Sequence, residues 1–167
     1  MARVKTGDLL TLLSWHRLFP ATLMRPQINV RLAIAWGMAL AMRFDDALRL
    51  ASETERDIRL NDAEDAELLR CECQTIRSVA IALKDDSKEA LSIAERCLET
   101  STDPWTVNVA SNVVRFGRRK AGDLAKFYAT PWIPFSSDEE PRNVFASVYR
   151  LCLQGLVESP ATPVRAG

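Results

Sequence analysis

The chain lacks net charge. Its 22 Lys and Arg residues balance its 22 Asp and Glu residues over 167 positions, so the formal net charge is zero. A chain without a positive field has no general electrostatic attraction to nucleic acid or to an anionic membrane. A partner attracted by charge must therefore recognise a local patch, and we expect no direct DNA binding.

Long apolar runs and targeting segments are also missing. The nearest approach to a membrane span, residues 32–42, is bounded by Arg31 and Arg43 and falls short of the roughly 18 apolar residues required. The N-terminus lacks the basic start, apolar run and small-residue cleavage site of a secretory signal. These absences favour a cytoplasmic protein without membrane association.

Metal-binding side chains are scarce. His16 is the only histidine. Cys71 and Cys73 lie two residues apart in a helical pattern, so their side chains point to nearly opposite sides and do not chelate one ion together. Cys97 and Cys152 also lie in helical patterns, without the close pairing of a secreted disulfide framework. We expect buried free thiols, no metal site and no cofactor in this chain.

Motifs for catalysis are missing as well. No G-x-x-x-x-G-K-[ST] phosphate loop occurs in the sequence. His16 has no nucleophile and acid at recognisable local spacing, although a triad built from distant positions stays an alternative. The acidic residues 138–140 adjoin Pro141 and are typical of a helix start. We assign no catalytic residue and expect a protein that is not an enzyme.

What the sequence does contain is apolar residues at helical spacing along most of its length. The pattern indicates about eight helices, and no segment alternates as a strand would. A capping-box pattern at 61–64 and the pair Asp103 and Pro104 mark helix starts. Gly122 marks a helix end. The chain is therefore predicted to be one all-α domain over residues 1–158, followed by a disordered tail over 159–167.

The middle of the chain repeats itself. Ala47 and Ala90 lie 43 positions apart, and each is followed by alanine four residues later and preceded by a small residue twelve residues earlier. These companions are Ala51, Ala94, Ala35 and Ser78. Small residues on facing helices let two backbones approach closely, as in stacked helical hairpins. The spacing exceeds the about 34 residues of the strict tetratricopeptide repeat, which indicates longer helices or turns.

Further hairpins follow less clearly. The repeat predicts hairpins over about 26–59 and 62–100, and a third over 104–130 in which Arg115 and Phe127 stand where small residues are expected. The register of this third hairpin stays open. A last helix, 141–157, has no partner helix before the sequence ends. We predict tetratricopeptide-like hairpin repeats that form a right-handed superhelix.

Four segments carry a family resemblance. They are TGDLLTLLSW (6–15), LFP (18–20), LAIAW (32–36) and RFDDA (43–47). Their order resembles the helical-repeat region of MalT-type transcriptional activators, in which a "GD…LL.W…LP" segment leads to a "P.L.…AW.L" helix and a "GR.DEA" turn. This sequence has Met42 where glycine is commoner in the family. The resemblance is best over residues 6–100.

The resemblance implies a function. MalT-type regulators of the LuxR family carry an N-terminal nucleotide-binding domain, a superhelical sensor region and a C-terminal helix-turn-helix, and this sequence resembles only the middle one. It implies a domain that receives a small-molecule inducer or a partner protein and helps to control self-association, with ATP expected only in a missing N-terminal domain. The alternative is a free-standing adaptor that holds a peptide of a partner protein. A reading frame that continues into a helix-turn-helix would favour the regulator.

One basic cluster has two interpretations. Arg115, Arg118 and Arg119 share a helix face, as a phosphate contact requires, and Lys120 follows them. Cations in the last turn also stabilise the negative end of a helix. We favour the second interpretation.

The candidate binding residues come from the repeat register. In a tetratricopeptide array the first helices of successive hairpins line the concave face, and fold class alone does not identify the ligand. Of the four tryptophans, we interpret Trp15, Trp105 and Trp132 as core residues and Trp36 as a residue of that face. The candidate ligand- or partner-binding residues are Asn29, Leu32, Trp36, Glu72, Thr75, Asn112 and Arg119.

Overall fold

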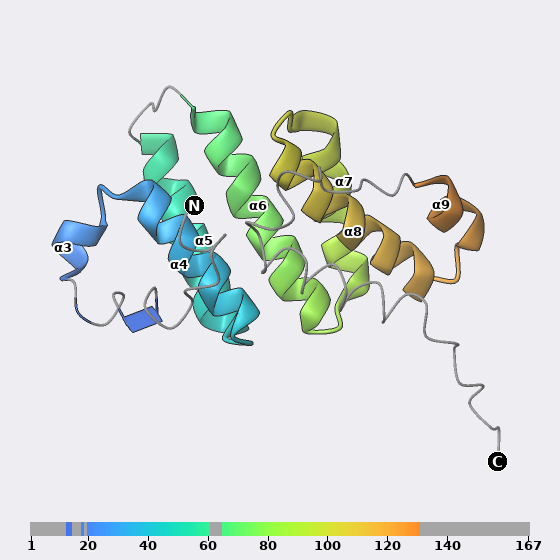
Figure 1. Ribbon diagram of the computed structural model, residues 1–167, viewed down its shortest axis with the longest axis horizontal. Coiled ribbons are helices and arrows are strands. Elements are labelled where there is room, and N and C mark those ends of the chain that lie inside the picture. Colours follow the sequence, from blue (N-terminus) through green and yellow to red (C-terminus); the bar gives the residue numbers. More distant parts are fainter. Residues whose placement is uncertain (1–12, 15–17, 19, 61–64, 131–167) are drawn as a thin grey trace, which may run out of the picture.

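Helices make up nearly all of the described chain (Figure 1). The structure is a computed structural model that describes residues 13, 14, 18, 20–60 and 65–130. Its helices are α3 (Ala21–Met24), α4 (Ile28–Leu40), α5 (Phe44–Leu60), α6 (Ala66–Leu83), α7 (Ser87–Thr100), α8 (Pro104–Lys120) and α9 (Leu124–Ala129). No strand occurs in these ranges. The all-helical prediction is confirmed for this part of the chain.

Some predictions fall outside the described residues. These are the capping box at 61–64, the last helix at 141–157, the tail at 159–167, and most of the first helix, of which Leu13, Ser14 and Leu18 are described and helical.

None of the helices in the described ranges is long and apolar enough to cross a membrane.

Aspartate side chains cap three of the helices. Asp86 accepts from the Glu89 amide at the start of α7, and Asp123 accepts from the Lys126 amide at the start of α9. Asp103 accepts from the Thr106 amide at 2.8 Å, with Pro104 in the first turn of α8, as the sequence predicts. Helix α6 differs, because its cap residue, Asp65, makes no side-chain capping hydrogen bond.

Consecutive helices pack as hairpins, and one helix lies at the centre. Helix α4 packs on α5, α6 on α7, and α8 on α9. Helix α6 also contacts α4, α5 and α8, so it is shared by neighbouring hairpins. The helices follow one another along the long axis from α3 to α9 (Figure 1). A groove beside α6 is therefore bounded by two hairpins at once.

The turns inside the three hairpins have the same backbone geometry. Met42, Asp85 and Gly122 have φ angles of 58°, 73° and 74°. In each turn the next amide donates to the carbonyl five residues earlier, a bond typical of a helix that ends in the left-handed conformation. These bonds join Arg43 to Met38 (2.9 Å), Asp86 to Ile81 (3.2 Å) and Asp123 to Arg118 (3.0 Å). The three turns are equivalent, which fixes the register that the sequence left open.

Small residues fill the first two hairpins and a large pair fills the third. Ala35 and Ala47 in the first hairpin, and Ser78 and Ala90 in the second, are fully buried. The equivalent positions in the third are Arg115 and Phe127. The Arg115 guanidinium lies over the Phe127 ring, 4.3 Å from its centroid, and Arg115 also donates to the Phe127 carbonyl at 3.3 Å and to the Thr130 carbonyl at 2.7 Å. Neither position of the third hairpin holds a small residue. The contacts of Arg115 with Phe127 and Thr130 therefore join these two helices in place of a close approach of small residues.

Helix α4 is enclosed, and it carries a charge inside. Every residue from 31 to 39 is buried, as the apolar run predicted. Arg31, predicted to bound that run, donates to Asp57 of α5 at 2.7 Å, and both side chains are only 6% exposed. Arg25 also donates to Asp57, and the Arg25 carbonyl accepts from Arg31. The charged Arg31 was expected to end the buried segment. It lies inside that segment instead, because it forms an ion pair with Asp57.

Candidate functional site

The structure separates the seven predicted binding residues. Asn29 is exposed, and Glu72 and Arg119 are partly exposed. The other four, Leu32, Trp36, Thr75 and Asn112, are buried. Thr75 donates to the Cys71 carbonyl within its own helix, and Asn112 donates to Asn108. Because all four side chains are buried among the helices, they do not form an open surface.

Two of the predicted residues do meet, and they join two hairpins. The indole N–H of Trp36 on α4 donates to the Glu72 carboxylate on α6 at 2.9 Å. The Trp36 ring also meets Trp105 of α8 edge to face, with centroids 5.8 Å apart and planes at 74°. Trp36 is 2% exposed, so it is a core residue and not the open groove residue predicted. One side chain from the first helix of each hairpin thus takes part in a single cluster.

A groove opens beside this cluster, between α6 and α8. It has a volume of about 220 Å³. Acidic side chains at Asp65, Glu72 and Asp103, and apolar ones at Leu68, Leu69 and Trp105, line it. No basic residue lines it. Leu68 is 42% exposed, so part of the apolar lining faces solvent. We call this the α6–α8 groove.

Trp105 is the groove residue that the sequence interpretation missed. It was interpreted as a core residue, but it is half-buried and lines the groove. It follows Pro104 in the first turn of α8. A tryptophan at the start of a helix has fewer neighbours than one in the middle. The position of Trp105 directly after Pro104 could therefore have indicated that its side chain is partly exposed.

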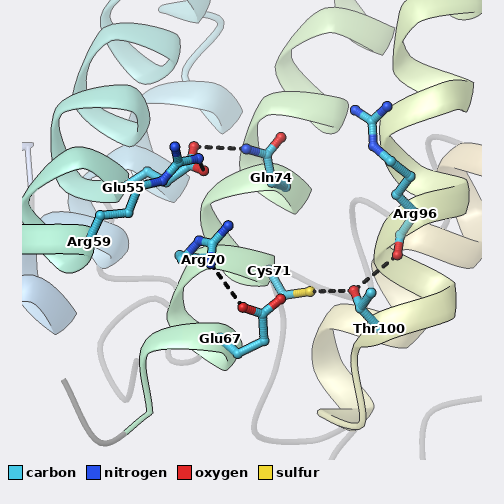
Figure 2. A network of polar contacts seen from close by, with 8 residues as sticks. All are labelled: Glu55, Arg59, Glu67, Arg70, Cys71, Gln74, Arg96 and Thr100. Atoms are coloured by element: carbon cyan, nitrogen blue, oxygen red, sulfur yellow. Dashed lines mark hydrogen bonds and ion pairs between the residues drawn. The ribbon is translucent and has the colours of Figure 1, made fainter. Parts of the chain in front are cut away.

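A second groove lies on the opposite side of α6, between α5 and α7. Residues two apart on a helix face nearly opposite ways, so Arg70 and Gln74 lie away from Glu72. The groove has a volume of about 260 Å³, with Arg59 of α5 and Arg96 of α7 also in its lining. Figure 2 shows the Glu55–Gln74 contact between α5 and α6 and the Cys71–Thr100 contact between α6 and α7. We call this the α5–α7 groove.

The basic cluster at the end of α8 is engaged within the chain. Arg118 donates to Glu95 of α7 at 2.9 Å and to the Lys126 carbonyl of α9 at 3.1 Å. Lys120 pairs with Asp85 in the turn before α7. The cluster ties α8 to its neighbours in addition to its place at the negative helix end, which supports the structural interpretation over an anionic ligand.

The described thiols are unsuited to nucleophilic chemistry. Cys71, Cys73 and Cys97 are free and buried, as predicted, and Cys152 lies outside the described residues. Burial raises the pKa of Cys73 to about 12 and that of Cys97 to about 11, so both stay protonated at neutral pH. In the described ranges no three His, Cys, Asp or Glu side chains are grouped to hold a metal ion.

Comparison with known proteins gives no relative from which a function could be transferred. No family model, no curated protein and no solved structure matches the chain. The function must therefore be argued from the grooves and the residues that form them.

Proposed function

We propose that this chain is a binding domain of tetratricopeptide type, whose hairpins stack as a right-handed superhelix. Three equivalent turns and a helix shared between hairpins support this proposal. In such arrays each hairpin packs only on its neighbours, and the stacked first helices present a binding surface. The observation that carries the proposal is the cluster of Trp36, Glu72 and Trp105, which joins the first helices of all three hairpins beside a groove.

The chemistry of the α6–α8 groove favours a cationic segment of a partner protein. Three carboxylates and no basic residue line it, so it attracts Lys or Arg side chains. Leu68 and Trp105 add apolar contact, and an arginine can stack on an indole face. A peptide that carries basic residues next to a Leu or aromatic residue satisfies both features. A free-standing adaptor would use the groove in this way.

A display selection tests this proposal. A library of random 12-residue peptides is panned on the full chain, and the affinities of enriched peptides are measured by calorimetry. We expect enriched peptides to combine basic and apolar residues, and Glu72→Gln to weaken binding about tenfold, or ~1.4 kcal/mol. Glutamine can still accept from Trp36, so the fold is retained.

The matched control is Glu53→Gln, which removes a partly exposed carboxylate from α5 outside this groove. It should leave the affinity unchanged. Enrichment of acidic peptides, or equal binding by Glu72→Gln and the parent chain, would contradict the proposal.

A narrower proposal follows from the sequence resemblance. We infer that the domain senses an inducer and controls self-association in a MalT-type, LuxR-family regulator. The order of the segments at 6–15, 18–20, 32–36 and 43–47 supports it. An inducer that binds one arrangement of the hairpins better than another shifts the population towards it.

Light scattering of the chain with and without a panel of small metabolites separates the two proposals. The regulator proposal predicts that one metabolite changes the molar mass of the particle. The adaptor proposal predicts peptide binding with no change in mass from any metabolite.

A further inference from the structure

We propose that the α5–α7 groove binds a small free anion that carries phosphate or carboxylate groups, held by Arg70 and Arg96. This site is distinct from the peptide groove, because it lies on the other side of α6 and uses α5 and α7 in place of α8. Its volume of about 260 Å³ is just below the roughly 300–1,000 Å³ typical of drug-sized ligands, which suits a small metabolite.

The buried carboxylate of the groove, that of Glu55, is already neutralised. Glu55 is buried, and it accepts from Arg59 at 2.5 Å and from Gln74 at 2.8 Å. Arg77 lies 3.8 Å from the same carboxylate. A buried carboxylate held by two arginines and an amide has little remaining attraction for a third cation. Glu55 therefore does not cancel the charge of Arg70 or Arg96.

Arg70 is only weakly committed to its partner. It donates to Glu67, which also lines the groove, at 3.1 Å. The Glu67 side chain is 66% exposed, and such surface pairs contribute little net free energy. The Nε atom of Arg70 is buried and has no hydrogen-bond acceptor. An anion that enters the groove can supply this acceptor with a small rotation of the side chain. A guanidinium and an oxyanion make strong paired hydrogen bonds.

Arg96 brings a second charge from α7. It is exposed and forms no ion pair in the described part of the chain. Its backbone lies within α7, where the Thr100 hydroxyl donates to the Arg96 carbonyl at 3.0 Å. The thiol of Cys71, 3.0 Å from the same hydroxyl oxygen, must then be the donor of that contact. Figure 2 shows this chain of bonds, which links α6 to α7 and ends at the Arg96 carbonyl oxygen.

Titration calorimetry of the full chain with sodium pyrophosphate and with sodium citrate, at constant ionic strength, tests the site. We expect saturable binding of at least one of them. Pyrophosphate alone would identify a phosphate ligand, and citrate alone a carboxylate ligand. The double variant Arg70→Gln with Arg96→Gln should weaken binding at least tenfold, while its circular dichroism spectrum stays that of the parent because Arg70 is partly exposed and Arg96 is exposed.

Two controls make the test specific. Arg56→Gln removes an exposed arginine of α5 outside the groove lining and should bind as the parent does. Glu72→Gln should also bind as the parent does, so failure of the peptide proposal leaves this one standing. The absence of saturable binding by both anions, or equal binding by the double variant, would overturn the proposal.

Discussion

Arg31 and Asp57 place two opposite charges inside the first hairpin, where water cannot solvate them. The Arg31 guanidinium holds the pKa of Asp57 below its usual value, against the opposing effect of burial, and Arg25 adds to this. The attraction offsets the loss of hydration only while both partners are present. Removal of one partner leaves an uncompensated charge.

We predict that Asp57→Asn lowers the free energy of unfolding by about 3 kcal/mol at pH 7, the low end of the range for buried pairs because the exposed Arg25 lies close by. The lowered pKa of Asp57 means that its contribution is present above about pH 4, the unfolded value, and is lost as pH falls through the folded value. Urea denaturation at several pH values measures this. Asp45→Asn, at an exposed pair with Lys84, should change little. Equal effects of the two substitutions would contradict the assignment.

Single residues also show where sequence reasoning stops. Trp36 and Glu72 were both candidate site residues, but their hydrogen bond joins positions 36 residues apart and depends on how two hairpins stack. Periodicity within one helix carries no information on that stacking. The burial of Thr75 and Asn112 was missed for the same reason, because the alignment gave their helix positions but not what neighbouring helices cover.

At the scale of elements, the three hairpin turns share a geometry but not a residue type. Met42 has a φ of 58° and a side chain that is 78% exposed, so it bears the strain of the left-handed conformation without packing in return. Gly122 adopts the same conformation at no steric cost.

We predict that Met42→Gly raises the free energy of unfolding by about 0.5–1 kcal/mol and that Gly122→Ala lowers it by about 1 kcal/mol. Chemical denaturation measures both. Met42→Ala is the matched control, because it removes the same exposed side chain but keeps the Cβ atom, and it should leave stability unchanged. If Met42→Ala and Met42→Gly behaved alike, backbone strain would not be the cause.

Gly117 of α8 lies closely against α7. A Cβ atom there would lie 2.9 Å from the Leu91 Cβ and 3.2 Å from the Ser87 carbonyl oxygen. Alanine favours a helix over glycine by about 1 kcal/mol, but this contact involves a backbone oxygen and a Cβ that cannot rotate away. The steric term should therefore dominate.

We predict that Gly117→Ala lowers the midpoint of thermal unfolding, at a cost of about 1–3 kcal/mol. Ser92→Ala, at an exposed position of α7, also favours the helix but meets no neighbour, and it should keep or raise the midpoint. A higher midpoint for Gly117→Ala would show that the helices do not pack as closely as described.

The elements themselves were largely predictable. The cap at Asp103, the end at Gly122 and the close positions Ala47 and Ala90 follow from local chemistry, so they could be found in the sequence. The register of the third hairpin could not be predicted from the sequence. Arg115 and Phe127 occupy the two positions where the first two hairpins have small residues, so no pattern of small residues marks this hairpin.

At the scale of the whole molecule, a chain with no net charge distributes its charges unequally on the two sides of α6. Carboxylates and no basic residue line the α6–α8 groove, whereas three arginines and two glutamates line the α5–α7 groove. The sequence required a local patch for any charged partner, but it could not place one, because each groove combines residues from different hairpins.

The central claim is that the α6–α8 groove is the surface that receives a partner. The measurement that tests it most directly is an NMR map of the full chain titrated with an eight-residue peptide of alternating lysine and leucine. We predict shifts confined to residues 65–72 and 103–106 and to the Trp105 indole, and weaker shifts in Glu72→Gln. Shifts that map to α5 and α7, or that persist unchanged in Glu72→Gln, would contradict the claim.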